Sequence, residues 1–159
     1  MLTGNRKGSG ITDQGRNRRS ITVRNGTITN FKVGVSLDDT VEAVIRDLQV
    51  IGNSSDGIQA GEGCIISDNV ASRNDGEGII ATDGECLVKN NVANFNDEDG
   101  LQLDGSGHTV VGNTANSNDD DGIEVDCPSN LADNTAIKNG QVNLKDVGAG
   151  CEKSKNLAP

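Results

Sequence analysis

The sequence of 159 residues predicts an all-β protein: a single-stranded parallel β-helix, or solenoid, of about seven rungs of ~22 residues each. Three observations predict this fold. Asparagines recur at separations of 21 to 23 residues, a glycine or asparagine follows each of them four residues later, and an aliphatic residue comes next. The recurring asparagines are Asn30, Asn53, Asn74, Asn96, Asn118 and Asn139, and the residues four positions later are Gly34, Gly57, Gly78, Gly100, Gly122 and Asn143.

Each rung is expected to contain short strands joined by turns. Apolar residues form i, i+2 pairs, such as Ile79 with Ala81 and Leu101 with Leu103, which is the period of a strand with one buried face. Clusters of Gly, Asn and Asp separate these pairs, as turns do. The sequence has no lasting apolar pattern of helical spacing. Two further columns of core residues are Ile66, Val88, Val110 and Leu131, and Val50, Ala71, Ala93, Ala115 and Ala136.

The sequence divides into three segments. Residues 1–20 are interpreted as a polar and basic partial rung, residues 21–150 as the β-helix, and residues 151–159 as a C-terminal tail. Residues 1–35 carry seven basic residues and one acidic residue, whereas the remainder carries seven basic and 23 acidic residues. No amphipathic cap covers the first rung, so we expect its strand edge to be covered by a second copy of the chain or by a larger parent protein.

Two columns of asparagine are predicted to be structural. An inward-facing amide at a bend can donate to the next rung and accept from the previous one, as in stacked amide ladders. The glycine that follows four residues later is expected to supply a positive φ where the chain enters the next strand. The first ladder comprises Asn53, Asn74, Asn96 and Asn118, and the second comprises Asn69, Asn91, Asn113 and Asn134.

The unit N-x-A-x-x-N-x-x-x-G-I, present at residues 69–79 and 113–123, resembles the repeat of the pectate-lyase-like group of right-handed parallel β-helix proteins. The resemblance covers residues 20–150, and right-handed coiling is what it implies. The group includes pectate lyases, polygalacturonases, alginate-modifying enzymes and phage tailspikes. Membership would therefore define a fold and leave the activity open.

The four cysteines are expected to form two disulfides. Cys64 and Cys86 occupy one column, so their Cα atoms should lie ~4.8 Å apart, within the span of a disulfide. Cys127 and Cys151 fall on the last rung and the tail, and this pairing fits the rungs best. Two disulfides predict a secreted or periplasmic protein. A metal site that includes His108, which continues the Cys64 and Cys86 column, and free buried thiols are the alternatives, but the sequence has no C-x-x-C pair typical of zinc sites.

Acidic residues occupy most positions between a ladder asparagine and its glycine. Stacked rungs place these like charges ~4.8 Å apart, where each pair repels by about 1 kcal/mol in water and by more at lower dielectric. A bound cation would relieve the repulsion, and oxygen ligands suit Ca²⁺. The alternative is a hydrated acidic edge that keeps the rod soluble. The candidate metal ligands are Asp75, Glu77, Asp97, Asp99, Asp119 and Asp121.

No residue of the sequence is assigned a catalytic role. Pectate lyases add a basic residue to Asp-bound calcium, but Arg73 and Lys89 match no motif of that family. Residues 107–108 and 119–121 resemble fragments of polygalacturonase motifs, without the G-H-G and R-I-K motifs. The aromatic-G-x-D-P-H motif of alginate epimerases is absent.

These observations predict a secreted, non-catalytic β-helix for extracellular binding or structure, with calcium as its cofactor and an extracellular polysaccharide as its partner. The alternative is a small calcium-dependent polysaccharide lyase or another polysaccharide-active enzyme such as a glycoside hydrolase. A net charge of −10 argues against nucleic acid as a partner. No run approaches about 18 apolar residues, so no membrane span is expected. The first residues lack the apolar run of a secretory signal, so we expect any such signal to have been removed.

Overall fold

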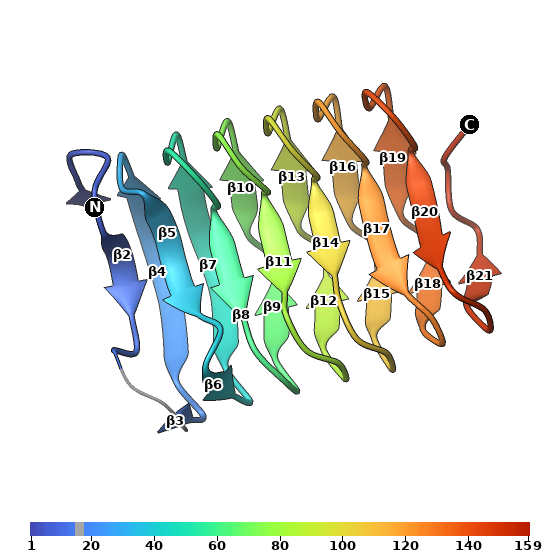
Figure 1. The fold of residues 1–159 in the computed structure, drawn as a ribbon, viewed down its shortest axis with the longest axis horizontal. Helices are drawn as coiled ribbons and strands as arrows, with labels where there is room; N and C mark the ends of the chain where they lie inside the picture. The colour runs from blue at the N-terminus through green and yellow to red at the C-terminus, as the bar shows by residue number, and fades with distance from the viewer. Residues whose placement is uncertain (15–17) are drawn as a thin grey trace.

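The computed structural model describes residues 1–14 and 18–159 and shows a parallel β-solenoid (Figure 1). The rungs stack along one axis, with the N-terminus at one end of the rod and the C-terminus at the other. The described residues include no helix. One sheet contains seven strands, one from each rung, which confirms the predicted number of turns.

The seven-stranded sheet forms one long side of the rod. Its strands are β2 (Ser9–Thr12), β5 (Val33–Leu37), β8 (Ile58–Ala60), β11 (Ile79–Ala81), β14 (Leu101–Leu103), β17 (Ile123–Asp126) and β20 (Leu144–Val147). A pair of two-residue strands, β3 (Arg18–Arg19) and β6 (Thr40–Val41), lies near the N-terminal end.

The twelve-stranded sheet supplies the remaining sides of the coil. Two strands of this sheet are long, β4 (Thr22–Thr29) and β7 (Val44–Ile51). Each of them spans the positions that two separate short strands occupy in the later rungs. One set is β9 (Ile65–Ser67), β12 (Leu87–Lys89), β15 (Thr109–Val111), β18 (Asn130–Ala132) and β21 (Glu152–Ser154). The other set is β10 (Val70–Ser72), β13 (Val92–Asn94), β16 (Thr114–Asn116) and β19 (Thr135–Ile137), and β1 (Leu2–Thr3) pairs with β4.

Equivalent residues of successive rungs stand side by side. Ile79 pairs with Leu101, and Val88 pairs with Val110, each at a separation of 22 residues. Inward-facing aliphatic side chains from the three sides fill the coil and are almost fully buried, so a narrow apolar stripe suffices for a continuous core. The first and last residues also join the solenoid, because β2 pairs with β5 and β21 pairs with β18.

Both asparagine ladders are present in the structure. The Asn113 side chain accepts hydrogen bonds from the Asn91 backbone N–H at 2.9 Å and from the Asn91 amide at 3.0 Å. Its own amide donates to the Val88 carbonyl at 2.9 Å and to Asn134 at 3.0 Å. The same four contacts recur along the first ladder, for example around Asn96. Asn156 extends the second ladder into the tail, and Asn143 ends the first.

Asn30 does not belong to the first ladder. The register pairs Thr29 with Ile51, so Phe31 stands opposite Asn53 and donates its backbone N–H to that side chain at 3.0 Å. Asn30 instead adopts a φ of 66° and donates its amide to the Gly4 carbonyl. Asn30 and Asn53 are 23 residues apart, whereas the register pairs residues that are 22 apart. Because separations of 21 to 23 residues all fit the repeat, the sequence alone did not reveal that Asn30 lies one position before the ladder.

The proposed reason for the column glycines was wrong. Positive φ values occur one residue before each ladder asparagine, at Arg73 and Phe95 for example, and the column glycines are not among the residues with positive φ. Instead, these glycines leave room for the next rung: a Cβ on Gly100 would lie 2.6 Å from both the Asn118 amide nitrogen and the Gly122 carbonyl oxygen. Close approach between backbones is therefore what requires glycine there.

Candidate functional site

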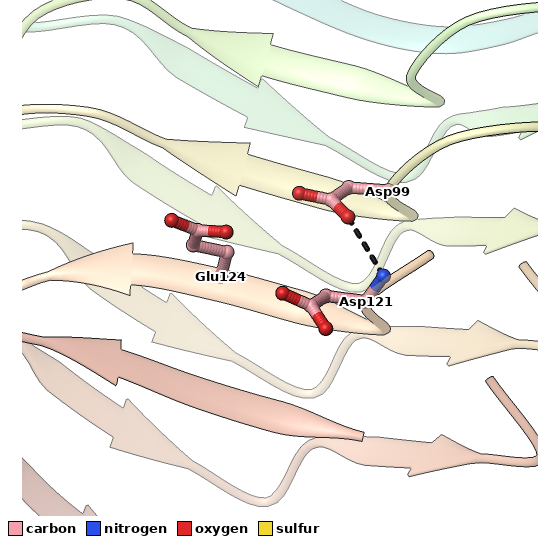
Figure 2. A group of neighbouring side chains, drawn as sticks. All are labelled: Asp99, Asp121 and Glu124. Atoms are coloured by element: carbon pink, nitrogen blue, oxygen red, sulfur yellow. Dashed lines mark hydrogen bonds between the residues drawn. The ribbon is translucent and has the colours of Figure 1, made fainter. Parts of the chain in front are cut away.

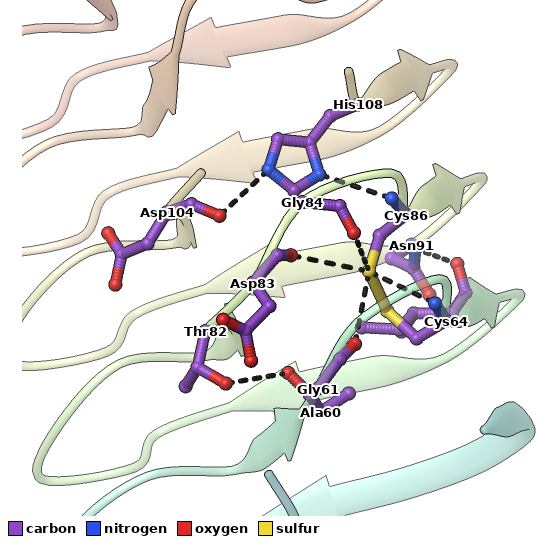
Figure 3. The surroundings of a disulfide bond; sticks show 11 residues. Ala60, Gly61, Cys64, Thr82, Asp83, Gly84, Cys86, Asn91, Asp104 and His108 are labelled. Atoms are coloured by element: carbon purple, nitrogen blue, oxygen red, sulfur yellow. Dashed lines mark hydrogen bonds between the residues drawn. A yellow bond between two sulfur atoms is a disulfide. The ribbon is translucent and has the colours of Figure 1, made fainter. Parts of the chain in front are cut away.

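The predicted disulfide pairing is the one that the structure contains. Cys64 is bonded to Cys86 and Cys127 to Cys151, with Cα–Cα distances of 4.6 and 5.1 Å. His108 lies beside the first bond and is fully buried (Figure 3). Its Nδ1 accepts the Cys86 backbone N–H, so its Nε2 carries the proton and donates to the Asp104 carbonyl at 3.0 Å.

Burial lowers the pKa of His108, which keeps the ring neutral. Both of its nitrogens are engaged by the backbone, and both neighbouring cysteines are oxidised. The alternative metal site on this column therefore lacks free ligands.

The acidic columns separate into an exposed one and a buried one. Asp75, Asp97 and Asp119 are exposed at the turns, and Asp75 forms an ion pair with Arg6. The second column borders the seven-stranded sheet, and its carboxylates are buried or half-buried. Its members are Asp56, Glu77, Asp99 and Asp121.

Three carboxylates converge where the buried column meets the outer face of the sheet (Figure 2). Asp99, Asp121 and Glu124 offer oxygen atoms that lie within 4.8 Å of one another. The backbone holds the first two in place: the Asp121 N–H donates to Asp99 Oδ1 at 2.7 Å, and the Val142 N–H donates to Asp121 Oδ1 at 2.8 Å. Because these donors belong to the next rung, the arrangement requires stacked rungs.

Lys145 supplies a counter-charge from the following rung. Its Nζ lies 2.8 Å from Asp121 Oδ2 and 2.8 Å from Glu124 Oε2. Hydrogen bonds to these two carboxylates raise the pKa of Lys145, so it stays protonated at neutral pH. The cluster thus combines three carboxylates with one ammonium group, and Asp99 is the member that Lys145 does not contact through an ion pair.

Burial raises the pKa of two carboxyl groups of this column. The pKa of Asp99 rises to about 6, and the backbone N–H of Asp121 opposes part of the effect. The pKa of Glu77 rises to about 8 through burial and then through hydrogen bonding to Asp56. Both groups therefore hold protons at pH values where ordinary carboxyl groups have lost them.

We expect these shifts to make the protein less stable as the pH rises from about 5 to about 8. In this window the folded state binds more protons than the unfolded chain, so the free energy of unfolding falls with increasing pH. Glu77→Gln should raise Tm by a few degrees at about pH 8 and change it little at about pH 5. Thermal unfolding followed by circular dichroism at both pH values measures this effect. Asp97→Asn, on the exposed column, is the matched control, and a Tm that rises with pH in the parent protein would contradict the expectation.

The outer face of the seven-stranded sheet carries a row of mostly polar side chains. Register places Gln59, Ile80, Gln102, Glu124 and Lys145 side by side on successive strands. Carboxylates flank the row on both of its long sides: Gln59 donates to Asp56, which precedes its strand, at 2.7 Å, and Gln102 donates to Asp104, which follows its strand, at 3.2 Å. This row therefore offers a hydrogen-bonding side chain on every one of these strands except that of Ile80.

The remaining candidates lie elsewhere. Lys89 is on β12, which belongs to the other sheet. The Arg73 guanidinium lies 5.3 Å from the centre of the Phe95 ring, and Phe95 is 52% exposed. Glu124 and Lys145 were not predicted from the sequence. Glu124 lies three residues after Asp121, and Lys145 lies three residues after Val142, which is the equivalent of Asp121 in the next rung, so this common spacing was the signal that could have identified them.

Comparison with known proteins defines the class to which this chain belongs. The model of the right-handed β-helix region matches residues 5–157, so the chain is a member of the right-handed β-helix family. This match establishes the handedness that the resemblance implied. Among curated proteins, none matches the sequence.

Solved structures of two alginate-modifying enzymes share the fold. The A-module of the mannuronan C-5 epimerase AlgE4 from Azotobacter vinelandii is 22% identical with a TM-score of 0.71, over 80% of this chain and 38% of that chain. A mutant of the periplasmic alginate epimerase AlgG is 17% identical with a TM-score of 0.73, over 87% of this chain and 45% of that chain. The chain thus spans less than half the length of these structures. No helix of the described residues is long and apolar enough to cross a membrane.

Proposed function

We propose that this chain is a secreted or periplasmic, non-catalytic β-helix domain that binds calcium and an acidic polysaccharide on the outer face of the seven-stranded sheet. The observation that carries the proposal is the convergence of Asp99, Asp121 and Glu124 within 4.8 Å at the edge of that face. Carboxylate oxygens are the ligands that Ca²⁺ prefers, and the ion would offset the repulsion among the three groups.

Lys145 limits the calcium affinity that is expected of this cluster. Its ammonium group already neutralises part of the charge of Asp121 and Glu124. Calcium must displace Lys145 or coordinate on the side of Asp99, so binding should be weak, in the range of extracellular calcium sites. Protons compete as well, because the pKa of Asp99 is raised to about 6. The affinity should therefore increase with pH.

A carboxylated polysaccharide is the partner that suits this arrangement. Calcium held by protein carboxylates can also coordinate carboxylates of a sugar chain, and the amides of Gln59 and Gln102 can exchange their present contacts for sugar hydroxyls. The two structural relatives act on mannuronan or alginate by name. Their similarity is limited to the fold, so the sugar class is part of the proposal.

The groups available on this face support binding better than catalysis. Lys145 stays protonated and cannot act as a base, and His108 is buried away from the sheet face with both nitrogens engaged. The alginate-epimerase motif is absent from the 159 residues. The two disulfides and the periplasmic location named for one relative support an oxidising compartment.

We expect millimolar Ca²⁺ to raise Tm by several degrees at about pH 8, because a ligand that binds only the folded state stabilises it by RT ln(1 + [L]/Kd). Asp99→Asn combined with Glu124→Gln should abolish the increase, and Lys145→Gln should enlarge it by removing the competing ammonium group. Differential scanning calorimetry with NaCl of equal ionic strength separates binding from screening.

Asp97→Asn combined with Asp119→Asn is the matched control, since it removes two exposed charges outside the cluster. If this pair abolishes the response, or if NaCl stabilises the protein equally, the calcium site is not at Asp99.

A calcium-dependent polysaccharide lyase is the second candidate. One observation favours it: Glu77 and Asp99, with pKa values raised to about 8 and about 6, border the same face and could exchange protons near neutral pH. Incubation with polygalacturonate or alginate, followed by absorbance of unsaturated products, tests it. Turnover that Glu77→Gln or Asp99→Asn eliminates would establish the enzyme and overturn the non-catalytic proposal.

A further inference from the structure

A second outward-facing surface of the solenoid carries a row of basic side chains. Register pairs Arg24 of β4 with Arg46 of β7, then Arg46 with Ser67 of β9, and Ser67 with Lys89 of β12. The residues that precede them in each strand, such as Ile45, Ile66 and Val88, fill the core, so Arg24, Arg46 and Lys89 face outward. We call these three residues the basic row.

The basic row is only partly neutralised. Arg46 forms an ion pair with the adjacent Asp47 at 2.9 Å, and both side chains are 41% exposed. Within the described residues, Arg24 and Lys89 have no carboxylate partner at ion-pair distance. Like charges placed opposite each other on neighbouring strands destabilise a sheet. The pairing of Arg24 with Arg46 therefore lowers the stability of the fold, although acidic residues outnumber basic ones in the protein as a whole.

An apolar row runs beside the basic row on the same surface. Val44, Ile65 and Leu87 are paired in register on β7, β9 and β12, two residues before the positions of the basic row. Ile65 is 38% exposed, and Val44 and Leu87 are partly exposed. Strands β7, β9 and β12 are neighbours in one sheet (Figure 1), so the register places the cations and the apolar side chains in two parallel lines along the rod.

We propose that this surface is a second, calcium-independent binding site for a carboxylated polysaccharide that runs along the rod axis. Sugar rings present C–H faces that can pack on the apolar row. Carboxylates of the polymer can meet Arg24 and Arg46 on neighbouring strands, and Lys89 two strands beyond Arg46, past the buried Ser67. Successive strands are spaced by ~4.8 Å, a distance comparable to one sugar unit, so one polymer can contact several rungs in register. Arginine is suited to this role because its planar fork pairs with a carboxylate through two hydrogen bonds.

The choice of a carboxylated polysaccharide as the ligand rests on the proposed function. The location of this second site and its independence from calcium do not. This surface belongs to the twelve-stranded sheet, whereas the acidic cluster borders the seven-stranded sheet. Chelation of calcium should therefore remove binding at the acidic cluster and leave binding at the basic row intact.

The test is isothermal titration calorimetry of the protein with a short oligouronate in EDTA at low salt. We expect measurable binding that Arg24→Gln combined with Arg46→Gln weakens by about tenfold or more, as expected from the loss of charged hydrogen bonds. Lys32→Gln combined with Lys138→Gln removes the same charge from exposed positions outside the row and should change Kd by less than about twofold. Circular dichroism confirms that both variants fold.

Three outcomes would overturn the proposal: no binding in EDTA, equal weakening by both double variants, or equally tight binding of single-stranded DNA. The last two would indicate attraction to any polyanion without a defined site. The failure of calcium to stabilise the protein would instead overturn the proposed function and leave this result unchanged.

Discussion

Replacement of Asn113 by alanine is expected to lower the free energy of unfolding by about 2–4 kcal/mol. The substitution removes the acceptor of the Asn91 N–H and the donor to the Val88 carbonyl, and both groups are buried between rungs. A buried polar group that loses its partner costs about 1–3 kcal/mol.

Urea unfolding measures the effect, with Asn94→Ala as the matched control. Asn94 is half-buried at the surface, and its side chain accepts one hydrogen bond, from the Asn116 backbone N–H. We expect its replacement to cost about 1 kcal/mol or less. Equal losses in the two variants would show that the ladder contributes no more than an ordinary surface asparagine.

The second large effect is expected for Gly100→Ala, which should destabilise the protein by about 3 kcal/mol. The added Cβ would approach the Asn118 amide nitrogen and the Gly122 carbonyl oxygen to 2.6 Å and the Ala115 Cβ to 2.9 Å. These atoms belong to the adjacent rung and are fixed by the ladder and the sheet. The rungs must therefore separate locally to admit one methyl group.

Gly26→Ala is the control for Gly100→Ala. Gly26 lies in β4, where the nearest atom to an added Cβ is Leu48 Cδ2 at 3.9 Å. Alanine there should be neutral or stabilise the protein by up to about 1 kcal/mol, because it restricts the unfolded chain. If Gly100→Ala is equally neutral in urea unfolding, close packing does not explain the glycine column.

The periodic sequence was sufficient to predict the solenoid, the ladders and the disulfide pairing, because each depends on which residues are equivalent in successive rungs. Cys64 and Cys86 are one period apart, and that alone brings their Cα atoms within bonding range. Asn30 shows the limit of this reasoning: an irregular rung displaced it by one position, which only the register of β4 with β7 reveals.

The site was harder to predict because it combines different columns. Asp99 and Asp121 belong to one column, but Glu124 lies on β17 and Lys145 on β20, the strands that follow the turns of two successive rungs. Their meeting depends on how the turn directs each side chain, and a column alignment contains no such information. The same applies to Gly100. The close atoms of the next rung, and not the backbone angles of Gly100 itself, account for the need for glycine at this position.

The near-constant separation of about 22 residues between paired strands has a consequence for how such a chain can change length. Each interior rung contacts only the rung before and the rung after it, through the same ladder and the same sheet positions. Duplication or deletion of one whole period would therefore preserve the kind of interface between rungs, whereas the loss of a few residues within a rung would misalign that rung with both of its neighbours. A gene for this fold can grow by copying a segment of itself, and each added copy would extend both proposed binding faces by one strand spacing.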